Sequence, residues 1–224
     1  MKRHQALLDQ ETARAVVYQK LADAFRLPSP DLSANMTALA DALKFLGSDA
    51  APDVARLAAE RYVEADRQDI TVDHAALFIG PFLVPAPPYG SIYLEDKRQL
   101  MGASTMAVRR HYLLIGLDIA PEFKEAPDHI CAELEFMHIL VYQALAAVDT
   151  GDHDLLMATI GQQRTFLERH LGAWVPAFAD KVAEHARTVF YRGLASVMRT
   201  FVAEDMEALP DLPVDHASSA QAGA

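Results

Sequence analysis

The sequence contains little that would support disulfide, nucleic-acid or membrane chemistry. Cys131 is the one cysteine in 224 residues, so no intrachain disulfide can form and a reducing compartment is favoured. Acids outnumber bases by 31 to 20, and the formal net charge of −11 argues against a surface that neutralises phosphates. No apolar run approaches the ~18 residues of a membrane span, and no apolar signal segment follows Met1. We therefore expect a soluble cytoplasmic protein without membrane insertion.

The sequence motifs of common enzymes are missing as well. The chain has no Gly-x-x-x-x-Gly-Lys loop, no Gly-x-Gly-x-x-Gly fingerprint and no Gly-x-Ser-x-Gly elbow. Glu135 and His138 form a Glu-x-x-His which, with Glu133, leaves a ferritin-like helical metalloprotein as an alternative. A carboxylate-bridged di-iron site needs a second Glu-x-x-His, and the sequence has none. We therefore predict no enzyme, no cofactor and no metal. A helical ligand-sensing regulator would need a basic recognition helix, which we do not find.

The apolar residues, which make up 51% of the chain, recur mostly at helical spacing. Apolar steps of three and four, with Gly and Pro at the ends, predict helices over 5–26, 31–47, 52–67, 72–79, 104–116, 127–150 and 154–171, and a long final helix from Pro176. Ser104 is predicted to be an N-cap, and Cys131 a buried, inert thiol. No alternating strand pattern appears. The sequence thus predicts an all-α, single globular domain of about ten helices.

The segment 117–126 interrupts the helical pattern. It contains Pro121 and several charged residues, so we interpret it as an exposed hinge between an N-terminal lobe (1–116) and a C-terminal lobe (127–209). A hinge permits exchange of lobes between chains, which leaves a monomer and a domain-swapped dimer both open. The tail 210–224 is rich in Ala, Ser, Asp and Pro and is predicted to be disordered.

A stiff loop precedes this hinge. Prolines occupy positions 81, 85, 87 and 88, and such a run cannot lie inside a helix because each ring fixes φ and removes an amide donor. Linkers are usually polar, whereas this loop carries Phe82, Leu83, Val84 and Tyr89. The loop therefore either packs on the body of the protein or lines a groove.

Two interpretations of Asp128 and His129 remain open from the residues alone. At a helix start after Pro127, an acid satisfies free amides and suits the helix dipole, which explains Asp128 by itself. Alternatively, Tyr89, Asp128 and His129 form one cleft with apolar walls and an acidic patch. Such a cleft suits a basic peptide with an apolar stretch: Asp128 would pair with guanidinium, and Leu83 and Tyr89 would contact the apolar part.

Two segments carry a family likeness. They are Leu77-Phe78, Gly80-Pro81 and the run VPAPPYGSIYL at 84–94, followed by PDHICAELEFM at 127–137, with Gly102, Ser104-Thr105, Tyr112 and Gly116-Leu117 between them. In order and spacing these residues resemble the TorD/DmsD/NarJ family of molybdoenzyme maturation chaperones over about sixty residues. One departure is Tyr89, since the family often has Trp after the proline pair.

The resemblance implies a non-enzymatic cytoplasmic chaperone without a cofactor. Its partners would be the apo-form of a molybdopterin oxidoreductase catalytic subunit and the twin-arginine signal peptide of that subunit, and it would assist cofactor insertion and prevent premature export. Signal-peptide binding in the family is placed at positions matching Pro88, Tyr89, Asp128 and His129, which favours the cleft. The complete candidate site is Leu83, Pro87, Pro88, Tyr89, Ser91, Asp128 and His129, with Glu133 as a candidate client contact.

Overall fold

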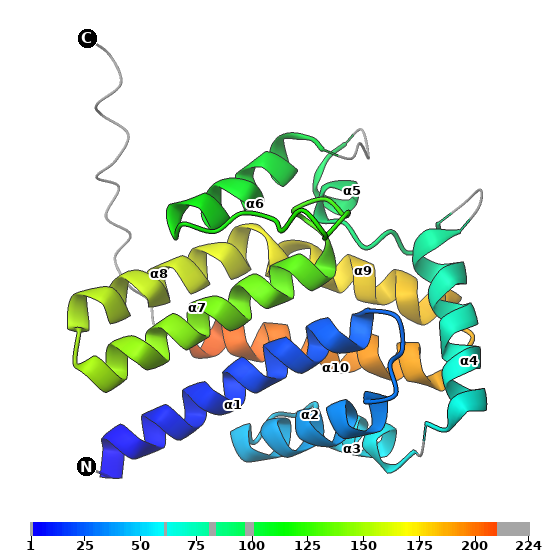
Figure 1. The fold of residues 1–224 in the computed structure, drawn as a ribbon, viewed down its shortest axis with the longest axis horizontal. Helices are drawn as coiled ribbons and strands as arrows, with labels where there is room; N and C mark the ends of the chain where they lie inside the picture. The colour runs from blue at the N-terminus through cyan, green and yellow to red at the C-terminus, as the bar shows by residue number, and fades with distance from the viewer. Residues whose placement is uncertain (1, 61, 81–83, 97–100, 210–224) are drawn as a thin grey trace.

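The chain folds into layers of helices around α7. The computed structural model describes residues 2–60, 62–80, 84–96 and 101–209. Over these ranges it has ten α-helices, one π-helical turn and no strand, which confirms the all-α prediction. In chain order the elements are α1 (Lys2–Phe25), α2 (Leu32–Leu46), α3 (Ala51–Ala59), α4 (Glu64–His74), η1 (Ala75–Ile79), α5 (Gly90–Leu94), α6 (Ala103–Leu114), α7 (Ile130–Thr150), α8 (His153–Arg169), α9 (Leu171–His185) and α10 (Val189–Ala208). Figure 1 shows α6 on one side of α7 and α8, with α1, α10, α2 and α3 on the other.

The centre of the core lies between α1 and α7. Apolar residues on α1 recur at helical spacing, and Tyr18, Leu21 and Phe25 are buried. α1 packs along α7 and α2, α7 packs along α8, and α9 packs along α10. One hydrophobic cluster therefore runs through both of the lobes expected from the sequence. The lobe boundary and the hinge stay predictions, and the tail 210–224 lies outside the described residues.

The apolar character of α7 reflects its place in the core. By length and composition it is the one helix among the described residues that could cross a membrane, with a mean hydropathy of 1.3, yet 61% of that window is buried inside the fold. Ile130, Leu134, Met137 and Val141 of the predicted apolar face are buried. Packing against α1 and α8 accounts for the hydropathy of this helix.

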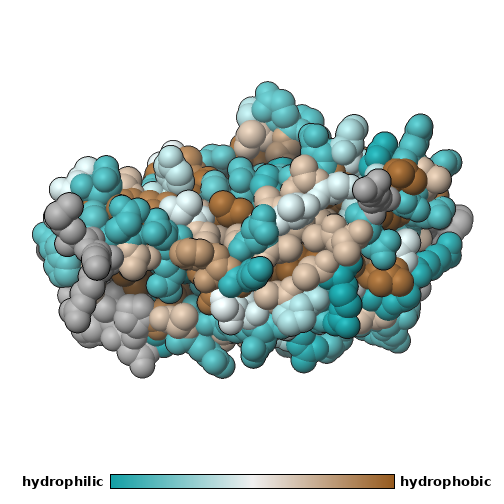
Figure 2. Space-filling model, turned by 90° about the horizontal axis from the view of Figure 1, so that it is seen from below, coloured by the Kyte–Doolittle hydropathy of each residue, from teal (hydrophilic) through white to brown (hydrophobic). Residues whose placement is uncertain are grey.

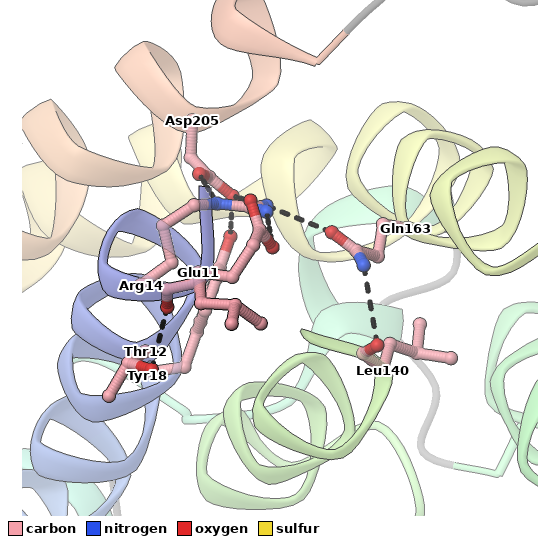
Figure 3. A network of polar contacts seen from close by, with 8 residues as sticks. Glu11, Thr12, Arg14, Tyr18, Leu140, Gln163 and Asp205 are labelled. Carbon is pink, nitrogen blue, oxygen red and sulfur yellow. Dashed lines mark hydrogen bonds and ion pairs between the residues drawn. The ribbon is translucent and has the colours of Figure 1, made fainter. Parts of the chain in front are cut away.

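A buried polar network ties α1 to three other helices (Figure 3). Arg14 of α1 donates to both carboxylate oxygens of Asp205 on α10, at 2.6 and 2.9 Å, and to Gln163 on α8 at 2.9 Å. Gln163 donates to the Leu140 carbonyl of α7 at 3.3 Å, and the Tyr18 hydroxyl donates to Asp205 at 2.6 Å. Because these side chains are buried and paired, they fix the relative positions of four helices.

Two helix ends follow local sequence signals, and one predicted cap does not. Gly47 and Gly151 end α2 and α7 with φ of 70° and 72°, as expected for glycine in the left-handed region. Ser104 is not an N-cap, because α6 begins at Ala103. The Ser104 amide and hydroxyl both donate to Glu95, so this serine tethers the preceding segment to α6.

The predicted helix over 52–67 is wrong. α3 ends at Ala59, Glu60 is extended with ψ of 137°, and a new helix begins at Glu64 after an extended Val63. α4 then continues directly into the π-helical turn η1. The expected short helix over 72–79 is therefore the end of a longer helical segment that leads into the proline loop.

The predicted long final helix is also wrong. Pro176 lies inside α9, and the chain leaves helical geometry after His185 before α10 begins. At this break Asp73 accepts hydrogen bonds from the amides of Arg187 and Thr188 and from the Thr188 hydroxyl, at 2.7–3.1 Å. The carboxylate comes from a distant part of the chain, so local periodicity could not reveal the break.

The face formed by α2 and α3 has a mixed surface. Figure 2 views the molecule from this side, and hydrophobic residues lie interspersed with hydrophilic ones. A cavity of about 550 Å³ between the two helices is lined mostly by alanines, with Asp41 and Lys44 as its charged residues. One acid and one base on an alanine surface offer little chemistry for a ligand.

Candidate functional site

The proline loop and the start of α7 are joined through their backbones. The Ile130 amide donates to the Pro88 carbonyl and the Gly90 amide donates to the Asp128 carbonyl, both at 2.9 Å. Tyr89 and His129 form an isolated antiparallel bridge between these two bonds. The structure thus brings together the two segments that the sequence analysis singled out. Leu83 lies outside the described residues.

Tyr89 and His129 also contact each other through their rings. The ring centroids lie 5.2 Å apart at an interplanar angle of 73°, and Phe123 packs on the same imidazole at 5.7 Å. The Tyr89 hydroxyl donates to Glu125. His129 is the N-cap of α7, since its Nδ1 accepts from the Cys131 amide at 3.2 Å. Burial lowers the pKa of His129 to about 4, against the opposing effect of Glu125, so this imidazole is neutral at physiological pH.

Asp128 acts on a different helix from the one expected. It does not lie in the first turn of α7, which begins at Ile130. Its carboxylate accepts from the Ser91 amide at 2.7 Å, so it caps the start of α5 from across the chain. Asp128 is 1% exposed and Ser91 is fully buried, so both side chains lie behind the Tyr89 turn. A guanidinium group cannot reach the Asp128 carboxylate in this arrangement, and the expected direct ion pair is not available.

Glu133 lies deeper under the same turn. Its side chain has no exposed surface and accepts from Trp174 Nε1 at 3.0 Å. Gly90 passes so close that an added Cβ would lie 2.9 Å from Trp174 Nε1, so a glycine is required at this position. Burial raises the pKa of Glu133 well above its usual range, so the fold favours the protonated carboxyl. A direct client contact by Glu133 is not available in this conformation, and we place this residue behind the site.

A groove of about 860 Å³ opens in front of this turn, between the end of α1, η1, the proline loop and the segment 117–126. We call it the loop groove. Pro88, Tyr89 and His129 line it, whereas Pro87 is half-buried and does not. Further apolar walls come from Leu27, Phe78, Ile79, Val84 and Phe123. Leu27 and Ile79 are 58% and 60% exposed, so the groove presents apolar surface to solvent.

The rim of the loop groove carries acidic side chains. Glu122 and Glu125 line it and are exposed. Of its cations, Arg26 pairs with Asp23 and Glu135, and Lys124 donates to the Pro121 carbonyl. From the sequence, 117–126 was interpreted as an exposed hinge, and neither glutamate was predicted to belong to the site. The available signal was Phe123, an aromatic residue within an otherwise charged run.

A second recess of about 460 Å³ adjoins the loop groove. We call it the side recess; it shares Arg26, Glu122 and Phe123 with the loop groove and is also lined by Ile119 and Phe136. The segment 117–126 therefore separates two apolar recesses. Cys131 is among the residues that line the loop groove and is 1% exposed, which confirms the predicted buried thiol. Burial raises its pKa to about 12.

The metalloprotein alternative receives no support from the geometry. Glu133 faces Trp174, Glu135 pairs with Arg26, and His138 Nδ1 lies 2.9 Å from the Ala15 carbonyl. The three side chains thus have three separate partners. Across the part of the chain that the structure describes, no group of three or more His, Cys, Asp or Glu side chains is arranged to hold a metal ion.

Comparison with known proteins supports the family likeness. Residues 29–180 match the family model described as nitrate reductase delta subunit. The chain is 31% identical over 212 residues to the chaperone protein TorD of Psychrobacter sp. (strain PRwf-1), covering 90% of this chain and 93% of that protein. It is 31% identical over 128 residues to the Tat proofreading chaperone DmsD of Salmonella typhi, covering 57% and 56% of the two chains.

The fold is also found in a solved structure. A protein of Archaeoglobus fulgidus proposed to act in redox enzyme maturation matches with a TM-score of 0.51 at 22% identity, over 87% of this chain and 93% of that one. The family match covers well over half of the chain, and the TorD likeness covers nearly all of it. This chain therefore belongs to the nitrate reductase delta subunit family of redox enzyme maturation chaperones, whose TorD and DmsD members are cytoplasmic chaperones of molybdoenzymes and not enzymes.

Proposed function

We propose that this chaperone binds the twin-arginine signal peptide of a molybdoenzyme precursor in the loop groove. The observation that carries the proposal is the meeting of an apolar groove with an acidic rim at the Tyr89–His129 contact. A twin-arginine signal peptide has complementary chemistry, because its paired guanidinium groups precede an apolar stretch. The printed name of the DmsD relative, a Tat proofreading chaperone, agrees with this assignment.

The apolar stretch of the peptide would lie against Ile79, Phe78 and Phe123. A volume of about 860 Å³ is within the range of pockets that take drug-sized ligands, so it accommodates a few side chains and not a whole leader. Burying one leucine-sized side chain contributes about 1.5–3 kcal/mol. A few such contacts, less the cost of ordering the peptide, give a binding energy suited to reversible capture.

The arginine pair would lie at the rim, against Glu122 and Glu125. Both carboxylates are exposed, and guanidinium binds carboxylate through two parallel hydrogen bonds. Asp128 and Glu133 have supporting roles in this proposal. Asp128 holds the start of α5 and Glu133 holds Trp174, so together they position the turn that carries Tyr89.

Binding in this way would keep the precursor from export while it is immature. A chaperone that holds the leader, and part of the apo-enzyme, delays the translocase until the molybdenum cofactor has been inserted. Release then depends on a lower affinity for the mature client, since a ligand shifts an equilibrium only through differential affinity.

Isothermal titration calorimetry with a synthetic twin-arginine leader from a molybdoenzyme tests the assignment. We expect the double variant Glu122→Gln/Glu125→Gln to weaken binding about tenfold, because it removes both rim charges at a cost of roughly 1.4 kcal/mol. Ile79→Ser should weaken it roughly fivefold through lost apolar contact. The matched control is Asp149→Asn/Glu207→Gln, which removes two exposed charges on the far ends of α7 and α10. Equal affinity in all of these variants would exclude the loop groove.

A further inference from the structure

A third cavity, between α6 and the junction of α8 with α9, differs in chemistry from the loop groove. We infer that it binds a compact oxyanion with two or more negative charges, a phosphate or a polycarboxylate. The cavity has a volume of about 560 Å³ and is lined by Arg110, Arg169, His111 and His170, with Leu113 and Leu114 among its apolar residues. Among the residues that the structure describes, no acidic side chain lines it, although the chain carries a net charge of −11. We call it the basic pocket.

Both guanidinium groups of the basic pocket are available to a ligand. Arg110 and Arg169 are exposed, and neither forms a hydrogen bond or ion pair with any other residue that the structure describes. Their neighbour Arg109 behaves differently, since it pairs with Asp118 through two bonds of 2.6 and 2.9 Å. An arginine fork matches the oxygen geometry of phosphate and carboxylate, and two forks on one cavity match a dianion.

The basic pocket also contains a buried polar atom that lacks a partner. His170 is 5% exposed, and its Nδ1 has no hydrogen bond within the described part of the chain. Its ring lies 5.0 Å from that of His111 and 5.2 Å from that of Phe166, measured between centroids. Buried polar groups are nearly always hydrogen-bonded, so an unsatisfied imidazole nitrogen on a cavity indicates a partner outside the chain. Solvated surface arginines alone would not produce this feature.

His170 lies at the junction of two helices. It ends α8 and is the N-cap of α9, so the negative end of one helix dipole and the positive end of the other meet beside the basic pocket and offset each other. Burial lowers the pKa of His170 to about 4, with His111, Arg169 and Arg110 adding to the effect. The His170 imidazole is therefore a neutral hydrogen-bonding group at physiological pH, and the two arginines supply the positive charge.

The basic pocket is separate from the loop groove. Tyr112 of α6 faces the side recess, where its hydroxyl donates to the Pro127 carbonyl at 2.7 Å. Arg110 and His111 precede it on the same helix and line the basic pocket instead. The inference consequently does not depend on signal-peptide binding, and either site can be tested without the other.

Calorimetric titration of the full chain with inorganic pyrophosphate and, separately, with citrate tests the inference. We expect saturable binding of at least one probe, with Kd raised about tenfold by Arg110→Gln and by Arg169→Gln. Arg109→Gln is the matched control, because it removes one charge from the same helix outside the basic pocket. His170→Phe should also weaken binding while it keeps the packing against Phe166, and circular dichroism verifies its folding.

The outcomes separate clearly. Pyrophosphate binding alone assigns the basic pocket to phosphates, citrate binding alone assigns it to carboxylates, and binding of both supports a general oxyanion site. Absence of saturable binding for both probes at millimolar concentration overturns the inference. An unchanged Kd in both Arg110→Gln and Arg169→Gln also overturns it. The same holds if Arg109→Gln raises the Kd as much as these two variants do.

Discussion

Replacing Asp128 tests whether this carboxylate supports the loop groove or contacts the ligand. In the fold the Asp128 carboxylate accepts a hydrogen bond from the Ser91 amide at 2.7 Å, and the residue is 1% exposed. Asp128→Ala removes the acceptor and leaves the buried Ser91 amide unpaired. Loss of a helix cap costs about 0.5–2 kcal/mol and a buried unpaired group about 1–3 kcal/mol, and both estimates describe the same bond. We expect unfolding free energy to fall by about 2 kcal/mol and Tm by roughly 4–8 °C.

The effect of Asp128→Ala on binding should not depend on the arginine pair of the peptide. If Asp128 only positions the turn, Asp128→Ala displaces the whole Tyr89 turn. It should then weaken binding of a twin-arginine leader and of its twin-glutamine version by the same factor. The coupling energy between Asp128 and the arginine pair should then stay within about 0.5 kcal/mol. The rim variant Glu122→Gln/Glu125→Gln should instead couple to the pair by about 1 kcal/mol or more. Calorimetry on the four protein and peptide combinations gives each coupling energy.

Asp128→Asn is the decisive control for this reasoning. Asparagine removes the charge but keeps an oxygen that can accept from the Ser91 amide. It should therefore retain most of the Tm and most of the peptide affinity. The positioning role is refuted if Asp128→Asn loses as much affinity as Asp128→Ala with an unchanged Tm, or if Asp128 couples to the arginine pair by more than about 1 kcal/mol.

Two further predictions concern stability. Asp205→Asn should lower the free energy of unfolding in urea by at most about 3–5 kcal/mol, because the buried Arg14 charge then keeps only Glu11 as an ionic partner among the described residues. Arg14→Met/Asp205→Leu should recover part of the loss, since the buried Tyr18 hydroxyl still lacks its acceptor. Glu133 binds one more proton in the folded state than in the unfolded state between its usual and its raised pKa, so stability falls as pH rises through that range. Glu133→Gln should therefore gain stability over the wild type in urea titrations as pH rises above the ordinary pKa of a glutamate; parallel profiles would contradict the raised pKa.

Local signals in the sequence were sufficient for most of the helices. Gly47 and Gly151 end their helices through a backbone conformation that glycine adopts by itself, so no distant contact is needed. The break before α10 depends on Asp73, which lies more than a hundred residues away along the chain. The Arg14–Asp205 network likewise joins residues that no local pattern relates. Periodicity detects the faces of helices but not the polar contacts that divide or lock them.

The meeting of the two segments that form the candidate site was predictable, but the directions in which their carboxylates point were not. The proline loop and the start of α7 were both identified from composition, and their backbone pairing places Tyr89 against His129. Asp128 was then expected to pair with guanidinium in the cleft, because the family resemblance outweighed its alternative role as a helix cap. In the fold Asp128 points inward to Ser91, and the exposed carboxylates come from the neighbouring segment 117–126. Only the three-dimensional path of 117–126 shows that this segment, and not Asp128, supplies the exposed carboxylates.

The path of 117–126 also relates binding to release under the proposed function. Phe123 packs on His129, and Glu125 accepts from the Tyr89 hydroxyl, so this segment forms one wall of the loop groove. A peptide in the groove contacts that wall and the start of α7 at once, and it therefore favours the arrangement in which the two are packed together. The peptide then opposes any event that separates Phe123 from His129. By thermodynamic linkage, such an event lowers the affinity for the peptide by the same free energy. A displacement of this segment by the maturing client would then suffice for release, without any chemical step in the chaperone.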